Sequence, residues 1–301
     1  MRRLERNVAR LEAENAQLRQ DTIEWRSFFP PGHFYSPIPS KQEIAEAFAR
    51  RNPGREEYPG VHLDEAAQFA LLQKFAGWSA DMPFPEKRTP GWRYYLENDS
   101  YPTFDGVMLY SMLRHIHPRR IIEVGSGFSS AAMLDLNERV HDRRIEISFI
   151  DPEMERLKRL LRRDDRGNVR LLEQRVQDVP LAEFERLESG DILFIDSSHV
   201  AKIGSDVNHL YFTVMPRLKP GVYVHIHDIP DHFDYPRQWY DEGRAWNEVF
   251  LLRAFLMYNR AFEVAFFAPW IVNLNLPWVH EHMPLCARGG GGQIWLRRIV
   301  E

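Results

Sequence analysis

One short segment, residues 120–132, constrains this chain more than any other part of its sequence. It reads Arg-Ile-Ile-Glu-Val-Gly-Ser-Gly-Phe-Ser-Ser-Ala-Ala. The β-branched run that ends at Val124 predicts a strand buried on both faces, and Gly125 and Gly127 then interrupt it. The serines that follow can cap a helix. A strand, a glycine turn and a helix in this order bring backbone N–H groups and a helix N-terminus close to a ligand.

The residue just before this turn is acidic. Because Glu123 stands at the end of the expected strand, we expect its carboxylate to point into the same crevice. Its charge would repel a phosphate and attract an ammonium group. The sequence therefore favours a cationic amino acid ligand over a dinucleotide.

The segment Glu123-Val-Gly125-Ser126-Gly127 resembles the first motif of class I S-adenosylmethionine-dependent methyltransferases. The resemblance covers residues 105–300. This region is similar to bacterial O-methyltransferases that act on small molecules or sugars. It implies that Glu123 and the neighbouring backbone of Gly125, Ser126 and Gly127 hold the amino acid part of S-adenosylmethionine.

Composition narrows the class of protein. With 301 residues, of which 44% are hydrophobic, the chain can build one sizeable core but not two large domains. A formal charge of -4 gives no general attraction to nucleic acid or acidic membranes. The single cysteine, Cys286, excludes an intrachain disulfide framework and fits a reducing compartment. We expect a cytoplasmic protein without a secretory signal or a membrane span.

The N-terminal region, residues 1–26, shows a heptad pattern. Apolar or register-setting residues recur at alternating spacings of four and three, at Leu4, Val8, Leu11, Asn15, Leu18, Thr22 and Trp25. The pattern predicts a short coiled coil that forms a homodimer. The alternative is a single amphipathic helix that packs on its own domain.

Residues 27–104 form a helical and aromatic region before the expected methyltransferase domain, residues 105–301. Its second half, residues 78–104, is dense in Pro, Trp and Tyr. A long segment of this kind is often a lid or a binding segment. The alternative is an aromatic cluster packed on the surface of the core.

Strands and helices alternate after the glycine turn. The further strands are expected at residues 145–150, 169–173, 191–196, 222–228, 262–267 and 293–299. This alternation predicts a parallel sheet with helices on both faces. We expect no helix between the last two strands, which suits the antiparallel hairpin that closes methyltransferase sheets. The predicted fold is a Rossmann-like, doubly wound α/β sheet of seven strands, mostly parallel with an antiparallel last strand, plus N-terminal helices.

Ligands of open α/β sheets bind beyond the carboxyl ends of the strands, so the residues there are the candidates. Asp151 ends the second strand, where a carboxylate can accept both ribose hydroxyls; the alternative is an N-cap, with Pro152 at the first helical position. The resemblance implies that a side chain after the third strand holds the adenine amino group. We expect that side chain to be Asp178, the alternative being an ordinary loop aspartate.

Polar residues also follow the fourth and fifth strands. The resemblance to catechol- and caffeoyl-type O-methyltransferases implies that Asp196 and Asp228 bind a metal. The usual third ligand would fall at Ile229, and His227 is its expected replacement. Two carboxylates suit Mg²⁺, and a histidine favours Mn²⁺, Fe²⁺ or Zn²⁺. The alternative is that these side chains only position a substrate.

His199 lies three residues after Asp196, where a neutral imidazole could accept a proton from a substrate hydroxyl. The alternative is a structural histidine at the start of a helix. The implied reaction is methyl transfer from S-adenosylmethionine to a hydroxyl of a small molecule, sugar or glycan, assisted by a base or a metal. Two rivals remain open, an NAD-dependent oxidoreductase or epimerase and a non-catalytic scaffold that works through its N-terminal heptads.

Overall fold

The computed structural model describes residues 10–12, 15, 28–51, 58–167, 169–289 and 291–300. The chain divides into two compact units, one made of residues 1–55 and 237–245, the other of residues 56–236 and 246–301. Within the described ranges, no helix is both long enough and apolar enough to cross a membrane.

The first unit contains two described helices that contact each other, α2 (Lys41–Arg50) and α9 (Arg237–Asp241). The rings of Phe48 and Tyr240 meet edge to face, with centroids 6.1 Å apart. The predicted coiled coil over residues 1–26 falls almost entirely outside the described residues, so the homodimer stays a prediction.

The second unit is built on a seven-stranded sheet with the strand order β3-β2-β1-β4-β5-β7-β6. The strands are β1 (Arg120–Val124), β2 (Glu146–Ile150), β3 (Val169–Leu172), β4 (Ile192–Ile195), β5 (Tyr223–His227), β6 (Phe262–Phe267) and β7 (Gln293–Arg298). The first five run parallel, and β7 runs antiparallel to both β5 and β6. This arrangement confirms the predicted fold class.

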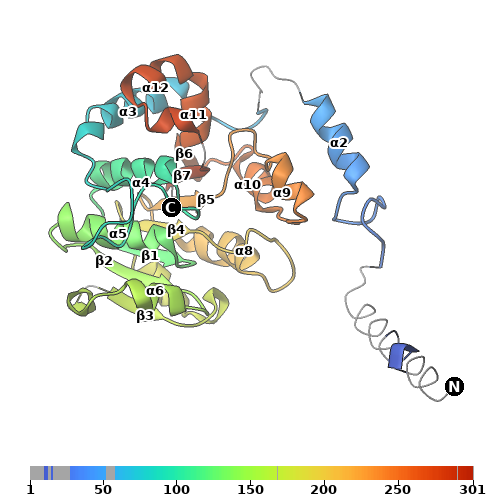
Figure 1. The fold of residues 1–301 in the computed structure, drawn as a ribbon, viewed down its shortest axis with the longest axis horizontal. Helices are drawn as coiled ribbons and strands as arrows, with labels where there is room; N and C mark the ends of the chain where they lie inside the picture. The colour runs from blue at the N-terminus through green and yellow to red at the C-terminus, as the bar shows by residue number, and fades with distance from the viewer. Residues whose placement is uncertain are drawn as a thin grey trace. The chain divides into compact units, whose positions relative to one another are not determined.

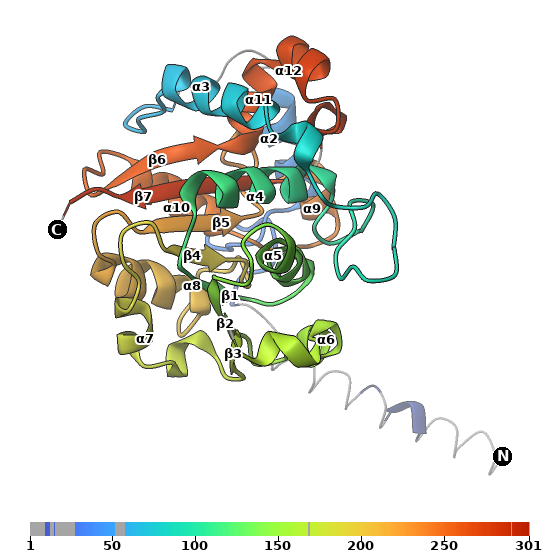
Figure 2. The ribbon, with the colours of Figure 1, turned by 90° about the vertical axis from the view of Figure 1, so that its left-hand side faces the viewer.

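Helices cover both faces of the sheet, as Figures 1 and 2 show: α4 and α5 lie on one face, and α8 and α10 lie on the other. The helices of this unit are α3 (Glu65–Ala76), α4 (Thr103–Ile116), α5 (Phe128–Arg139), α6 (Glu155–Leu160), α7 (Leu181–Glu185), α8 (Asp206–His209), α10 (Glu248–Leu256), α11 (Ala268–Leu274) and α12 (Leu276–His282). Shorter helical turns are η1 (Ser79–Asp81), η2 (Arg163–Gly167), η3 (Val176–Asp178), η4 (Leu210–Val214), η5 (Met215–Arg217) and η6 (Cys286–Arg288).

The expectation of a helix-free connection between the last two strands is wrong. Two helices, α11 and α12, lie between β6 and β7. Each begins with a proline in its first turn, Pro269 and Pro277. Proline is favoured at that position because its missing N–H would have no helical partner there, although in a sequence the same residue suggests a loop.

The register of the central strands brings the candidate residues together. Val124 pairs with Ile150 on β2 and with Ile195 on β4, so three strands end at one level. The next residues along the chain, Asp151 and Asp196, therefore emerge at the same edge of the sheet as the glycine turn.

The aromatic segment of residues 78–104 is held to the sheet unit by a buried arginine. The Arg93 guanidinium donates to Asp135 at 2.7 Å, to Glu138 at 2.9 Å and to Asp165 at 2.7 and 2.8 Å. These partners lie on α5 and η2, and the Arg93 side chain is almost fully buried. The segment is thus an anchored, packed cluster, and only its last residues reach the candidate site.

We expect the substitution Arg93→Met to lower the free energy of unfolding by about 3–5 kcal/mol, because it leaves buried carboxylates without their cation. Urea denaturation measures this. The matched control is Arg144→Met: the Arg144 side chain is 81% exposed and pairs with Asp142 at 3.2 Å. Removing such an exposed pair should cost less than about 1 kcal/mol. Equal, small losses in both variants would contradict the anchoring role.

Candidate active site

A cavity of about 400 Å³ lies beyond the carboxyl ends of the central strands. Gly125, Ser126 and Gly127 line it on one side, and Asp151 and Asp196 line it as well. Five of the predicted site residues therefore border one cavity, at the edge of the sheet where α/β folds bind ligands.

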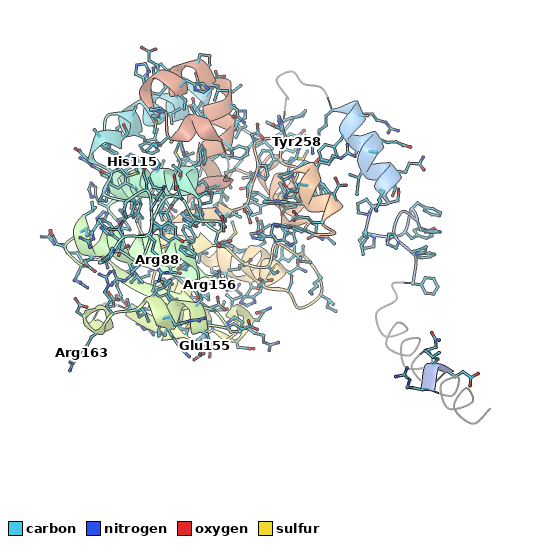
Figure 3. The ribbon with its side chains drawn as sticks, in the orientation of Figure 1. Arg88, His115, Glu155, Arg156, Arg163 and Tyr258 are labelled. Carbon is cyan, nitrogen blue, oxygen red and sulfur yellow. The ribbon has the colours of Figure 1, made fainter. Side chains whose placement is uncertain are left out.

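The glycine turn fits tightly against the end of β4. Gly125 has a φ of 85°, which L-residues rarely adopt, and a Cβ there would overlap the backbone carbonyl of Asp196. Gly127 is different. Its backbone is extended, and a Cβ there would have the Nη1 atom of Arg156 (labelled in Figure 3) as its nearest neighbour, at 3.8 Å. Gly125 is thus required by the fold, whereas Gly127 leaves open space beside the cavity.

The expectation that Glu123 points into the crevice is wrong. Its side chain is fully buried and accepts hydrogen bonds from the hydroxyls of Ser129 at 2.6 Å and Ser130 at 2.5 Å. The Ser130 hydroxyl in turn accepts from the Gly127 N–H at 2.9 Å. Because neighbouring residues of a strand face opposite sides, Val124 lines the cavity and Glu123 faces the first turn of α5. Burial outweighs the two serine hydrogen bonds and raises the pKa of Glu123 to about 8. Through the two serines, this carboxyl connects the end of β1 to the first turn of α5.

Asp151 lies directly after β2, beside the glycine turn. Its Oδ2 accepts from the Ser126 N–H at 2.8 Å and from the Ser126 hydroxyl at 2.9 Å, while Oδ1 accepts from the Glu153 N–H at 2.7 Å. It is not the N-cap of the next helix, since α6 begins at Glu155. Asp151 therefore joins the glycine turn to the end of β2 and borders the cavity.

Asp178 lies outside the cavity, contrary to the expectation. Its side chain is half exposed, and its carboxylate accepts from Arg175 at 2.8 and 3.1 Å. That hydrogen bond lowers the pKa of Asp178. Gln177 lines the cavity in its place and donates to the carbonyl of Gly204 at 2.8 Å. The sequence located the correct turn, but turn geometry decides which of two adjacent side chains faces inward.

Further cavity residues were not identified from the sequence. They include Ser100, Tyr101, Arg156, Arg175, Gln177, Ser197, Ser198 and Asp206. Tyr101 belongs to the aromatic segment, whose composition was the one available signal. The others are polar surface types in loops or short helices, which no periodic pattern marks.

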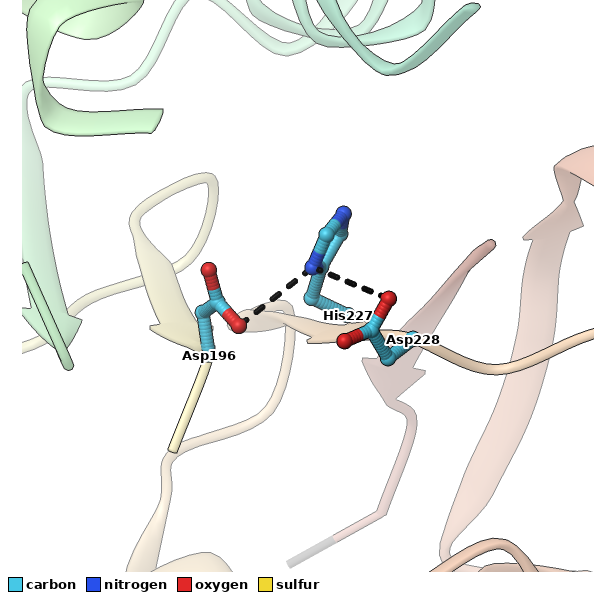
Figure 4. Close-up of side chains that lie close together, drawn as sticks. All are labelled: Asp196, His227 and Asp228. Carbon is cyan, nitrogen blue, oxygen red and sulfur yellow. Dashed lines mark ion pairs between the residues drawn. The ribbon is translucent and has the colours of Figure 1, made fainter. Parts of the chain in front are cut away.

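Asp196, His227 and Asp228 come together at the other end of the site, as predicted. Each offers a ligand atom, and these atoms lie within 4.8 Å of one another. The Nδ1 atom of His227 is 3.3 Å from Oδ1 of Asp196 and 3.7 Å from Oδ1 of Asp228. Figure 4 shows this nitrogen facing both carboxylates, while the other ring nitrogen points away.

The three residues fit a divalent cation. His227 is buried, and within the described part of the chain neither of its ring nitrogens makes a hydrogen bond. An orphaned imidazole nitrogen that faces two carboxylates is the donor set of a transition metal or Mn²⁺ site. The strand phase agrees with the prediction, because β5 ends at His227 and Asp228 begins the loop.

His199 is clamped between carboxylates. Its Nδ1 lies 2.8 Å from Oε2 of the buried Glu248, and its Nε2 lies 3.4 Å from Oδ2 of Asp228 and 3.6 Å from Oδ1 of Asp196. Burial lowers the pKa of His199, but the Asp196 and Glu248 carboxylates outweigh it and raise the pKa to about 10. The expected neutral imidazole is therefore a cation at pH 7 as long as these carboxylates are uncompensated.

The two aspartates differ in their acidity. Burial would raise the pKa of Asp196, but His227 and His199 outweigh it and hold the pKa far below its usual range. For Asp228 burial prevails and raises the pKa. The site thus combines acidic and basic groups whose proton affinities are shifted by their surroundings, as is typical of catalytic clusters.

A family model described as a methyltransferase domain matches residues 122–229, from β1 to the loop after β5. These are the strands that carry the cavity and the acidic cluster, and the sheet has the antiparallel β7 expected of this fold. Residues 122–229 therefore carry a methyltransferase domain, set in a sheet of the class I S-adenosylmethionine-dependent methyltransferase type.

Individual proteins that are similar to this chain have low to moderate sequence identity to it. An uncharacterised protein of Archaeoglobus fulgidus is 34% identical over 171 residues, which cover 54% of this chain and 76% of that protein. The apo structure of CmcI-N160 is 18% identical, with a TM-score of 0.42 over 84% of this chain and 99% of that one. The methyltransferase PaMTH1 of Podospora anserina, bound to SAH, is 15% identical, with a TM-score of 0.41 over 87% of this chain and 98% of that one.

We expect Gly125→Ala to lower the free energy of unfolding of this methyltransferase by roughly 2 kcal/mol or more, because it combines a left-handed backbone with a backbone overlap. Gly127→Ala, whose backbone is extended and whose Cβ has room, should cost less than about 1 kcal/mol. Denaturant titration of both variants measures the difference. A Gly125→Ala protein as stable as the Gly127→Ala protein would show that β1 and β4 are not held this closely.

Proposed function

We propose that this chain transfers the methyl group of S-adenosylmethionine to a hydroxyl of a small molecule or sugar, with help from a divalent cation. The observation that supports this most directly is the continuity of the site. A single cavity extends from the glycine turn to Asp196, which also belongs to the acidic cluster. A donor held at the turn would therefore present its methyl group to that cluster.

The cofactor would occupy the cavity between β1, β2 and the turn after β3. Its amino acid part would lie against Gly125 and Gly127, where backbone can approach closely. Asp151 would bind the ribose hydroxyls with a carboxylate that Ser126 already orients. Gln177, which lines the cavity where Asp178 does not, would face the adenine.

Asp196, His227 and Asp228 would hold the cation at the acceptor end. A bound cation supplies positive charge that lowers the pKa of a nearby hydroxyl and orients it. The three side chains come from the ends of two adjacent strands, so the acceptor oxygen would be positioned by the rigid part of the fold. Such positioning can contribute about 7–11 kcal/mol in the best cases.

His199 would then accept the hydroxyl proton at Nε2. Glu248 accepts the hydrogen bond from Nδ1–H, which leaves Nε2 directed at Asp196 and Asp228. The pKa of about 10 arises from carboxylate charge, so His199 is a base at neutral pH only when that charge is balanced. In the transfer, the acceptor oxygen forms a bond to the methyl carbon, the carbon–sulfur bond breaks, and the proton moves to His199. S-adenosylhomocysteine and the methyl ether are the products.

Asp151→Asn should weaken the binding of S-adenosylhomocysteine by roughly 10–100-fold, because hydrogen bonds to a charged group contribute about 1.5–3 kcal/mol. Asp178→Asn should change that affinity less than about twofold, since its carboxylate is paired with Arg175 outside the cavity. Isothermal titration calorimetry measures both, with thermal melting as the check on folding. A large loss in the Asp178 variant would instead support the adenine role that the sequence predicts for Asp178.

Asp196→Asn and Asp228→Asn should each reduce methyl transfer by more than about 100-fold while S-adenosylhomocysteine still binds. The measurement is incorporation of labelled methyl from S-adenosylmethionine into a panel of phenols and sugars, with and without EDTA. Asp142→Asn is the control: Asp142 is exposed, lies before β2 and has a left-handed φ of 50°, which asparagine tolerates. Activity that EDTA does not reduce would contradict the role of a metal. Absence of cofactor binding in the unaltered protein would contradict the proposed function.

A further inference from the structure

The second ring nitrogen of His227 faces a carboxylate from a distant part of the chain. Nε2 lies 3.4 Å from Oδ2 of Asp105, which is on α4. Both side chains are buried. Neither the cofactor cavity nor the acidic cluster includes Asp105, so the proposed chemistry does not explain a buried carboxylate at this place.

Asp105 ends a buried chain of hydrogen bonds that starts on β7. The indole N–H of Trp295 donates to Oε1 of Gln293 at 2.8 Å, and Nε2 of Gln293 donates to Oδ1 of Asp105 at 2.9 Å. All three side chains are fully buried. An indole nitrogen can only donate, so Trp295 fixes which end of the Gln293 amide is the acceptor. The amide of Gln293 must therefore present its N–H₂ group to Asp105.

The donor-to-acceptor direction of these hydrogen bonds bears on His227. Asp105 accepts from Gln293 with one oxygen and has its other oxygen, Oδ2, against Nε2 of His227. Gly291 also approaches this carboxylate closely, and a Cβ there would overlap both of its oxygens. A carboxylate oxygen accepts and an imidazole N–H donates, so this contact calls for the proton on Nε2 of His227. Its Nδ1, which faces Asp196 and Asp228, is then the nitrogen that could bind a cation held by these carboxylates.

We propose that Asp105 is a positioning residue, and that Trp295, Gln293 and Asp105 form a relay that sets the tautomer of His227 for metal binding through Nδ1. The purpose of the relay rests on the proposed function; the hydrogen-bond polarity does not. A histidine ligand is oriented in this way when its second nitrogen donates to a carboxylate, and loss of such a partner weakens metal binding about 10–100-fold.

The decisive variant is Asp105→Asn, which keeps the shape but not the polarity. The introduced amide oxygen must accept from Gln293, because Trp295 prevents the Gln293 amide from turning over. The introduced N–H₂ then faces Nε2 of His227 and forces the proton to Nδ1. Adding Trp295→Phe removes the indole donor, so both amides can turn over and Nε2 can carry its proton again.

The relay is tested with two measurements on the full chain. The ¹⁵N shift of Nε2 in His227 should show a protonated nitrogen in the unaltered protein, an unprotonated one in Asp105→Asn, and a return toward protonation in the double variant. Mn²⁺ titration should show affinity reduced about 10–100-fold in Asp105→Asn, little changed in Trp295→Phe, and largely restored in the double variant. Such restoration is the result a merely structural role would not produce, since two structural losses add.

The controls separate the possible failures. Thermal melting and S-adenosylhomocysteine affinity, which depends on the other end of the cavity, report whether each variant folds. Protonated Nε2 in Asp105→Asn, or additive losses of Mn²⁺ affinity, would overturn the relay. If the unaltered protein binds no Mn²⁺, the metal in the proposed function fails, and the ¹⁵N shifts alone decide the relay.

Discussion

The site depends on the close contact between two backbone segments, the glycine turn after β1 and the first residue after β4. Gly125 approaches the Asp196 carbonyl so closely that no side chain fits between them. The backbone N–H of Asp196 donates to Val124 at 2.9 Å, and that of Gly125 donates to Ile150 at 2.9 Å. These contacts fuse the proposed cofactor end and the acidic end into one edge of the sheet, so the distance between them is set by the backbone and not by mobile side chains.

The acidic cluster is built at a cost to the stability of the fold. Asp196, His199, His227 and Asp228 lie close together in a buried region, and Glu248 adds a further carboxyl. His199 and Asp228 also have left-handed φ values of 58° and 55°. A left-handed conformation at such a residue costs free energy of order 1–3 kcal/mol, and it persists only where the surrounding structure enforces it. The combination of strained backbone and shifted acidity is consistent with selection for chemistry at this point.

The sequence revealed most of the fold because the central strands are continuous apolar runs with polar residues directly after them. The same feature located Asp196, His227 and Asp228, since strand ends of a parallel sheet meet at one edge. The direction in which individual side chains point was harder to predict from the sequence. Whether Glu123 faces the cavity or α5, and whether Gln177 or Asp178 faces inward, depends on strand phase at the last residue and on turn geometry, neither of which a single sequence displays.

The placement of Glu123 also changes the reason for preferring one cofactor. Its charge was the sequence argument against a dinucleotide, but the carboxyl lies beneath the turn and meets no ligand. The assignment to the methyltransferases rests instead on the family match over residues 122–229 and on the antiparallel β7. The raised pKa of His199 likewise could not be read from the sequence, because besides Asp196 it depends on Glu248, which lies on a helix 49 residues further along the chain.

The anchoring of Arg93 has a consequence for turnover. Tyr101, which lines the cavity, belongs to a segment that is fixed to α5 and η2 through buried ion pairs. That side of the pocket cannot swing outward without exposing unpaired charges. If the chain acts as proposed, the cofactor would therefore enter and leave the cavity on the side away from this segment, past the loops that follow β2 and β4.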